Sequence, residues 1–143
     1  MAMTADQREF LRAHRLCVFG FDRREGPPSL SPVYYLMDGD DLLISTLTAR
    51  GKARAVRRNA EVTLCVLDET YPFPYLTVFG RAAVVESGAI DILMRIREVM
   101  TGVLPSGDER AALEAQGIEE GRVVIRVTPE RFVSTPPRGQ RAQ

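Results

Sequence analysis

The spacing of apolar and polar residues along this chain predicts mainly β-strands, with helices in a few places. The strand-like segments are rich in valine, isoleucine and aromatic residues and are mostly bounded by glycine, proline or aspartate. The predicted strands cover residues 16–21, 29–37, 41–46, 61–68, 75–86 and 122–129, the last extended by residues 131–134. Helices are predicted over residues 4–14, 50–58 and 89–101, and a short one begins with capping-box spacing at residues 106–109.

The turns between these segments indicate how the strands are arranged. Asp38-Gly39-Asp40 is a hairpin signal, so the strands on either side of it are expected to be antiparallel neighbours. The strand over residues 29–37 is also expected to pair with the one before it, and Gly80 predicts a bulge where the sheet curves. Because curved sheets of this kind tend to close, the chain is expected to form an antiparallel β-barrel with flanking helices.

Length and composition are those of one globular domain. The chain has 143 residues, 45% of them hydrophobic, and we expect one domain over residues 1–135 and a disordered polar tail over residues 136–143. Cys17 and Cys65 lie in apolar runs, which predicts buried thiols and no disulfide. We see no leader and no run of about 18 apolar residues, so we expect a cytoplasmic protein without a membrane partner.

Positive charge is concentrated in one short stretch of a chain whose formal net charge is zero. No acidic residue occurs between residues 42 and 60, where the chain carries Arg50, Lys52, Arg54, Arg57 and Arg58. The stretch begins as an apolar strand, turns through hydroxyls and a glycine, and continues as a helix. Hydroxyls, cations and helix N-termini all bind phosphate, so the stretch predicts an anion site. Lys52, the only lysine among 19 basic residues, is expected there together with Arg50.

Helical geometry divides these cations. At roughly 100° per residue, Arg50, Arg54, Arg57 and Arg58 would share one face of the helix, which leaves Arg57 and Arg58 in solvent. Arg54 either joins the anion site or faces solvent. A simpler interpretation, in which all five cations form only a solvated helix face, also remains open.

Several classes of function have little support. A sequence pI near 6.6 argues against nucleic acid as the main partner. His14 is the only histidine and is expected at the surface of a helix end. We therefore expect neither a multi-histidine metal site nor a histidine-based triad within one chain. Cys-x-x-Cys, Gly-x-Ser-x-Gly and glycine-rich dinucleotide motifs are absent from the sequence. We therefore predict no metal, and no acid–base pair stands out as catalytic.

Seven segments, taken in order, resemble the split-barrel flavin and deazaflavin reductases, the superfamily that includes pyridoxamine 5′-phosphate oxidase, and in particular its actinobacterial branch that uses coenzyme F420. The segments are Ser31-Pro32-Val33-Tyr34-Tyr35-Leu36, Asp38-Gly39-Asp40, Leu43-Ile44-Ser45-Thr46, Arg50-Gly51-Lys52-Ala53-Arg54, and residues 62–68, 75–82 and 126–132. The resemblance covers residues 8–86 and 122–133. Family members often have asparagine where this chain has Ala55 and proline where it has Ala60, so by this resemblance one side-chain contact near the cofactor tail is not expected here.

The resemblance implies a homodimer of six-stranded antiparallel split β-barrels, the FMN-binding split barrel, with two cofactor sites at the dimer interface. It implies that Ser31, Pro32, Val33 and Tyr34 line the ring system of the cofactor, and that Ser45, Thr46, Arg50 and Lys52 take its phosphate end, with Arg54 as a further candidate. Tyr71 and Tyr75 flank a double-proline loop and are candidates for the wall supplied by the partner subunit, although packing would explain them equally well.

The function that the resemblance implies is transfer of a hydride from reduced F420 to an unsaturated small organic substrate. In such an enzyme the cofactor carries the chemistry while the protein binds, orients and shields it, so a missing acid–base pair does not count against it. Three alternatives remain open. They are an FMN-binding protein of the oxidase-like branch, a non-catalytic flavin or deazaflavin carrier, and a basic-helix module that binds nucleic acid or an acidic protein.

Overall fold

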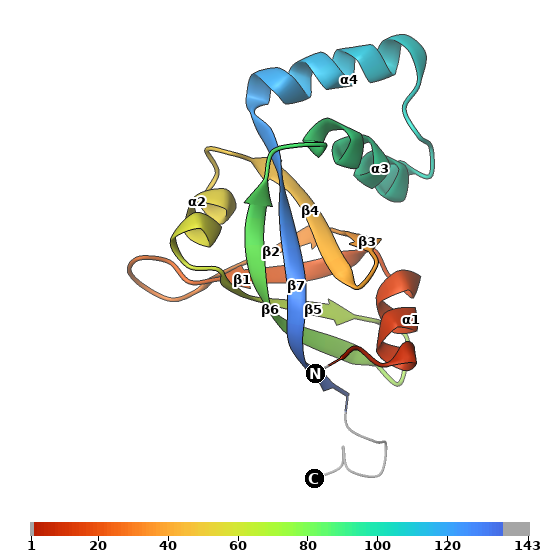
Figure 1. Cartoon of the computed structure of the whole chain (residues 1–143). Coiled ribbons are helices and arrows are strands. Elements are labelled where there is room, and N and C mark those ends of the chain that lie inside the picture. Colours follow the sequence, from red (N-terminus) through yellow and green to blue (C-terminus); the bar gives the residue numbers. More distant parts are fainter. Residues whose placement is uncertain (1, 136–143) are drawn as a thin grey trace.

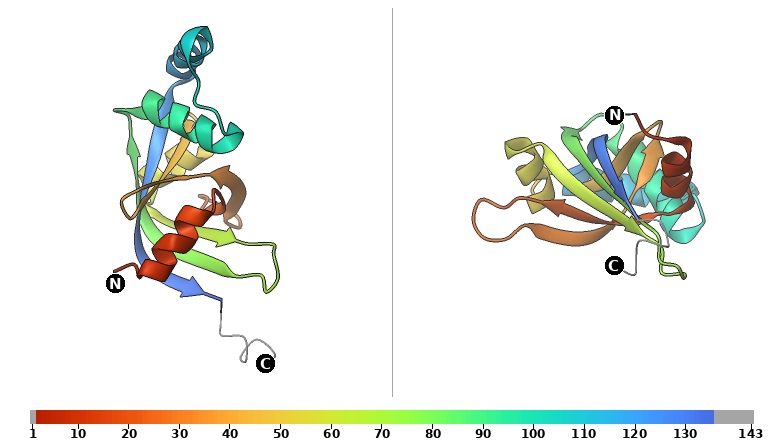
Figure 2. Two further views of the ribbon diagram at one scale, coloured as in Figure 1. Left: turned by 90° about the vertical axis from the view of Figure 1, so that its right-hand side faces the viewer. Right: turned by 90° about the horizontal axis from the view of Figure 1, so that it is seen from below.

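The computed structural model describes residues 2–135, which form one strongly curled sheet with four helices around it. In chain order the elements are α1 (Ala5–Ala13), β1 (Leu16–Phe21), β2 (Ser29–Tyr34), β3 (Leu36–Asp38), β4 (Asp41–Leu47), α2 (Gly51–Arg58), β5 (Glu61–Leu67), β6 (Tyr75–Val85), α3 (Ala89–Thr101), α4 (Gly107–Glu120) and β7 (Arg122–Ser134). Figures 1 and 2 show α1 and α2 beside the sheet and α3 and α4 at one end of it. The predicted tail over residues 136–143 lies outside the described residues.

The sheet closes into a barrel through one bent strand. Its antiparallel order is β2-β1-β5-β6-β7-β4-β3, so β2 and β3 occupy its opposite edges although only Tyr35 separates them in the chain. The predicted strand over residues 29–37 is therefore wrong in one respect. It is interrupted at Tyr35, whose backbone N–H donates to the carbonyl oxygen of Arg15 at 3.0 Å. The sheet has seven strands by its hydrogen bonds, and six around the barrel when β2 and β3 are counted as one, which confirms the split-barrel prediction.

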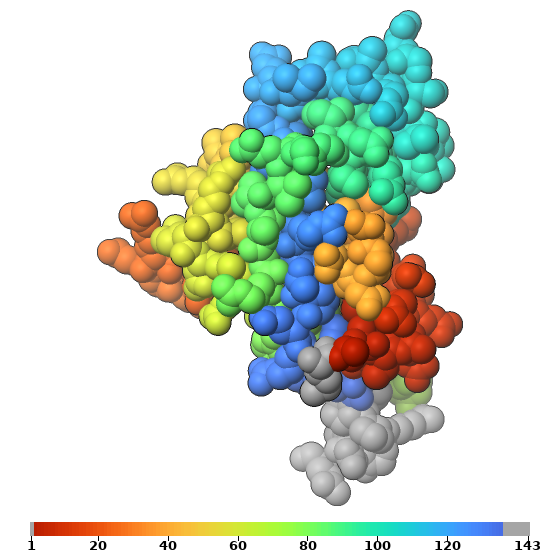
Figure 3. Space-filling model, viewed as in Figure 1, coloured from red at the N-terminus to blue at the C-terminus, as the bar shows by residue number. Residues whose placement is uncertain are grey.

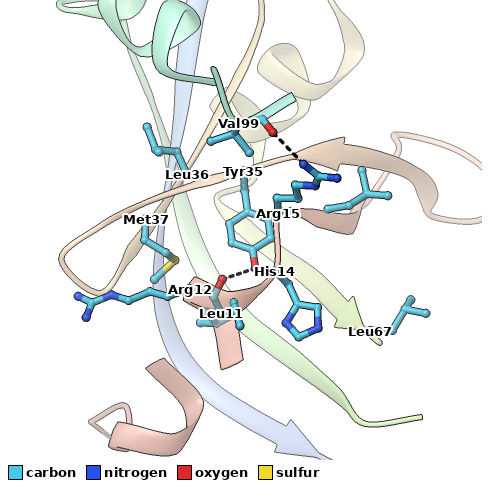
Figure 4. Close-up of a pocket in the computed structure, with 11 residues that line it drawn as sticks. Leu11, Arg12, His14, Arg15, Tyr35, Leu36, Met37, Leu67 and Val99 are labelled. Atoms are coloured by element: carbon cyan, nitrogen blue, oxygen red, sulfur yellow. Dashed lines mark hydrogen bonds between the residues drawn. The ribbon is translucent and has the colours of Figure 1, made fainter. Parts of the chain in front are cut away.

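Residues at the junction of β2 and β3, which we call the seam, form hydrogen bonds with the neighbouring helices. The hydroxyl of Tyr35 donates to the carbonyl oxygen of Leu11 in α1 at 2.5 Å, and Arg15 reaches across a neighbouring cavity of about 560 Å³ to donate to the carbonyl oxygen of Val99 in α3 at 3.2 Å (Figure 4). Only 2% of Tyr35 is exposed, and this burial raises the pKa of its hydroxyl, which therefore stays protonated and able to donate. The seam, α1 and α3 are thus held together at one place.

Backbone geometry explains the start of α1 and confirms the predicted bulge at Gly80. Thr4 caps α1, with its hydroxyl accepting from Gln7 N–H while the Gln7 side chain accepts from Thr4 N–H. The register of β6 and β7 shifts at Gly80, as the predicted bulge requires. A Cβ at Gly80 would lie 2.7 Å from the carbonyl oxygen of Thr128, so the two strands approach too closely there for a side chain.

The helix after residue 106 differs from the prediction. Ser106 precedes α4, but its side chain makes no capping hydrogen bond, and α4 is a 14-residue helix where a short one was expected. It packs on α3 through Gly117, where a Cβ would lie 2.8 Å from Cδ1 of Ile90. The close contact lets the two helices cover one end of the barrel together (Figure 3).

The main core lies inside the barrel and includes Ile44 and Val78, both 0% exposed. Leu43, 1% exposed, lies on the opposite face of β4, in a second cluster with Ala89 of α3 and Val124 of β7.

Cys17 is buried, Cys65 is half-buried, and both are free, which confirms that they form no disulfide. Burial raises the pKa of the Cys17 thiol to about 12, so this thiol is inert as a nucleophile at neutral pH.

The surface position predicted for His14 is corrected. The ring is half-buried at the end of α1, with Nδ1 2.7 Å from the Phe10 carbonyl oxygen and Nε2 3.1 Å from the Asp68 carboxylate. The backbone N–H of Thr70, followed by His14, holds the pKa of Asp68 below its usual value. His14 therefore joins α1 to the end of β5, a contact between distant segments that the sequence did not reveal.

Candidate functional site

The main candidate site, which we call the ring cavity, is a space of about 530 Å³ where β2, β4 and the start of α2 face α3 and α4. Five predicted site residues line it, namely Pro32, Val33, Tyr34, Ser45 and Arg50. The helices add apolar side chains, namely Leu93, Ile96, Met100 and Leu113. The apolar side chains of α3 and α4 thus form one wall of the cavity.

Two serine hydroxyls in this region are buried without a hydrogen-bond partner in the described part of the chain, and both were predicted site residues. Ser45 Oγ belongs to a residue that lines the ring cavity, and Ser31 Oγ lies on β2 two residues before Val33. Alternate residues of a strand share a face, so Ser31 lies with Val33 on the side of β2 that packs against the core, and Ser31 does not line the ring cavity. An unsatisfied buried hydroxyl costs about 1–3 kcal/mol, which a polar ligand would offset.

The ring cavity is positively charged. Arg50, Arg97 and Arg122 line it, against a single acidic residue, Glu120. Glu120 lies 3.3 Å from Arg122, while Arg50 and Arg97 form no ion pair with any carboxylate between residues 2 and 135. An anion with an apolar part therefore matches both the charge and the walls of the cavity.

A second space, which we call the four-arginine hollow, adjoins the start of α2. It has a volume of about 380 Å³ and is lined by Arg23, Arg24, Arg54 and Arg58 around Phe21, Ser29, Gly51 and Ala55. None of the four arginines pairs with a described carboxylate, and Arg58 donates only to the carbonyl oxygen of Asp22, at 3.3 Å. Arg54 and Arg58 are like charges one helical turn apart, an arrangement that is unfavourable without a bound anion.

The hollow and the ring cavity are neighbours. Gly51 lines the hollow and directly follows Arg50 of the cavity. Along β2, Ser29 lines the hollow and Val33 lines the cavity. A ligand that extends past Arg50 would therefore reach the four arginines.

The structure corrects the predicted grouping of cations on the helix. Arg50 is the N-cap of α2 with an extended backbone, at φ −76° and ψ 159°, so it does not share a helix face with Arg54. Arg57 and Arg58 are exposed as predicted, but neither side chain is simply solvated. Arg57 donates to the Thr48 carbonyl oxygen at 3.1 Å and to its hydroxyl at 2.8 Å, and Arg58 lines the hollow.

Three predicted site residues line neither space, namely Ser31, Thr46 and Lys52. Lys52 is half-buried in the first turn of α2, where burial, and then the charge of Arg50, lowers its pKa. Thr46 is 5% exposed and follows Ser45 in β4, so its side chain points to the opposite face of that strand. The alternation along β4 explains why only one of the two hydroxyl residues reaches the cavity.

Sequence reasoning missed the polar residues that α3, α4 and β7 bring to the cavity. These are Arg97, Gln116, Glu120 and Arg122. Only Arg97 carried a local signal, because it lies within the apolar run of its helix. Between residues 2 and 135 no three His, Cys, Asp or Glu side chains are placed to hold a metal ion, and none of the helices is long and apolar enough to cross a membrane.

A six-stranded antiparallel split barrel is the fold of the flavin- and deazaflavin-binding split-barrel proteins. The chain belongs to the pyridoxamine 5′-phosphate oxidase family, whose model matches residues 3–135. The residues of the ring cavity fit such a cofactor, because apolar walls suit a ring system while Arg50 and the unpartnered Ser45 hydroxyl suit a phosphate.

Solved structures share this fold at low sequence identity. A conserved hypothetical protein from Mycobacterium tuberculosis is 23% identical, with a TM-score of 0.77 over 94% of this chain and 85% of that one. A FAD-binding protein from Mesorhizobium loti is 16% identical, with a TM-score of 0.68 over 92% and 94%. An F420 reductase is 24% identical, with a TM-score of 0.66 over 83% and 89%. No curated protein matches the sequence significantly.

Proposed function

We propose that this protein is an F420-dependent oxidoreductase that reduces an unsaturated small organic molecule. In this assignment Pro32, Val33 and Tyr34 contact the ring system, and Ser45 and Arg50 hold the phosphate. Lys52, in the first turn of α2, adds positive charge close to Arg50. The bound cofactor supplies the hydride, while the protein positions the ring and keeps water from it.

The residues of α3 and α4 complete the enclosure. Leu93, Ile96 and Met100 give the cavity an apolar wall opposite the strands, which suits a flat, largely apolar substrate beside the ring. Tyr34 lies on β2 beside this wall and is the one described lining side chain with a phenolic hydroxyl. It is our candidate for orienting the substrate by a hydrogen bond.

The observation that carries the choice of F420 over FMN is the four-arginine hollow next to Arg50. FMN ends at its phosphomonoester, whereas F420 continues beyond a phosphodiester into a tail with several carboxylates. The four guanidinium groups have no described carboxylate partner, and a tail of negative charges would supply one. The hollow thus supports F420, while the ring cavity alone would suit either cofactor.

Titration of the purified protein with F420 and with FMN tests this assignment, and Arg58→Ala sharpens it. Arg58 lines only the hollow, so we expect the variant to bind F420 roughly 3- to 10-fold more weakly and FMN unchanged, as the loss of one partly screened ionic contact implies. Fluorescence titration at fixed salt measures both affinities. If FMN binds more tightly than F420, or if Arg58→Ala weakens both equally, the FMN alternative replaces the proposal. A carrier would bind F420 but reduce no substrate.

We also propose a homodimer in which the partner completes each site. The loop between β5 and β6 holds Tyr71 and Phe73, which are 64% and 60% exposed and stack edge to face at 5.7 Å. Large exposed aromatic side chains of this kind are typical of protein interfaces. Light scattering at micromolar concentration is expected to give the mass of two chains, and a monomer would rule out the shared site.

A further inference from the structure

Glu120 is the only acidic residue among those that line the ring cavity. It is the last residue of α4, and its carboxylate lies 3.3 Å from Nε of Arg122 and accepts a hydrogen bond from Gln116 Nε2 at 2.7 Å. The hydrogen bond from Gln116, and then the charges of Arg122 and Arg50, hold the pKa of Glu120 below its usual value. The residue is therefore ionised at neutral pH, inside a site otherwise built for anions.

The backbone holds Glu120 next to the turn that carries Arg50. Gly121 ends α4 with φ 72°, and its carbonyl oxygen accepts from the N–H of Thr48 at 2.8 Å. A Cβ at Gly121 would lie 3.0 Å from Cγ2 of Thr48, so the contact is close. These contacts hold the backbone at the end of α4 beside the turn that leads to Arg50.

A carboxylate beside Arg50 repels phosphate groups of different charge to different extents. A phosphomonoester carries close to two negative charges above its second pKa of about 6, whereas a phosphodiester carries one. Repulsion by Glu120 grows with the charge of the phosphate group nearest to it, so it is larger for a monoester than for a diester. We propose that Glu120 is a specificity-determining residue that shifts the preference of the ring cavity from phosphomonoesters toward phosphodiesters. This inference rests on the proposed function only in placing a phosphate beside Arg50.

The test is Glu120→Gln, which removes the charge while keeping an oxygen that can accept from Gln116. We expect the variant to bind FMN more tightly and F420 with a smaller gain, so that the ratio of the FMN to the F420 dissociation constant falls roughly five- to tenfold at pH 8. Glu119→Gln is the matched control, because Glu119 is the exposed preceding residue of the same helix and does not line the cavity. It should leave the ratio unchanged.

The outcomes separate this inference from the proposed function. An unchanged ratio in Glu120→Gln, or weaker binding of both cofactors, would overturn the inference and assign Glu120 to holding Arg122, while the cofactor proposal would stand. If the wild type bound neither cofactor, the proposed function would fail. Methyl phosphate and dimethyl phosphate then decide the inference by thermal shift. It holds if Glu120→Gln strengthens stabilisation by methyl phosphate more than by dimethyl phosphate, and fails if both respond alike.

Discussion

Replacing Arg50 by alanine is expected to weaken cofactor binding by about 10- to 150-fold, as the loss of one charge-assisted phosphate contact implies. Arg50 lines the ring cavity together with Ser45, pairs with no carboxylate between residues 2 and 135, and caps α2 through its backbone alone. The alanine variant should therefore keep its fold. Fluorescence titration with F420 at fixed salt measures the loss, and the melting temperature should stay constant.

Arg95→Ala is the matched control for this comparison. Arg95 is exposed on α3 and lines neither the ring cavity nor the hollow. Its replacement by alanine removes the same charge as Arg50→Ala. If Arg95→Ala weakened binding as much as Arg50→Ala, the arginines would act only as a diffuse positive field and the phosphate site would be wrong. Lys52→Ala should weaken F420 binding by an intermediate factor, because Lys52 is close to Arg50 but lines neither space.

Replacing Tyr35 by alanine is expected to destabilise the protein by about 3–5 kcal/mol, the range found when a buried aromatic side chain is removed from a core. The ring is among the largest fully buried side chains, and it lies at the seam where β2 passes into β3. Tyr35→Phe should cost about 1–3 kcal/mol, because it leaves the buried carbonyl of Leu11 without its donor. Denaturant unfolding measures both free energies.

Tyr34→Phe serves as the control for the hydroxyl. Tyr34 points to the other side of the strand and is half-buried at the ring cavity, so its loss should change the free energy of unfolding by less than about 0.5 kcal/mol. Equal effects of Tyr34→Phe and Tyr35→Phe would show that the bond to Leu11 does not hold the seam.

Much of the fold could be predicted because its signals are local. Hairpin residues, the glycine of the bulge and strand-like composition each act within a few positions, and most strands and helices lie near their predicted places. The interruption at Tyr35 carried no such signal. It arises because one strand must pair with β1 at its start and with β4 at its end, a demand that exists only once the sheet has curled.

The candidate site was predictable only in part, and for a related reason. Five of the predicted residues share the ring cavity because β2 continues into β3, the neighbour of β4, and α2 starts shortly after β4. Arg54 and Arg50 do not share a site, because the helix begins at Gly51 and not at Arg50. Arg50 therefore lines the ring cavity, whereas Arg54 lines the hollow. Glu120 and Arg122 lie more than 60 residues beyond Arg50 in the chain, and no sequence motif indicates that they line the same cavity.

The position of β7 in the sheet has a consequence for how the protein is made. β7 pairs with β4 on one side and with β6 on the other, so it is central in the sheet although it comes last among the strands. During synthesis, β2-β1-β5-β6 and β3-β4 would exist as two partial sheets. The edges at β6 and β4 would stay unpaired until β7 is available. A growing chain therefore exposes aggregation-prone strand edges until residues 122–134 leave the ribosome, and a truncation before Arg122 should depend on chaperones for its solubility.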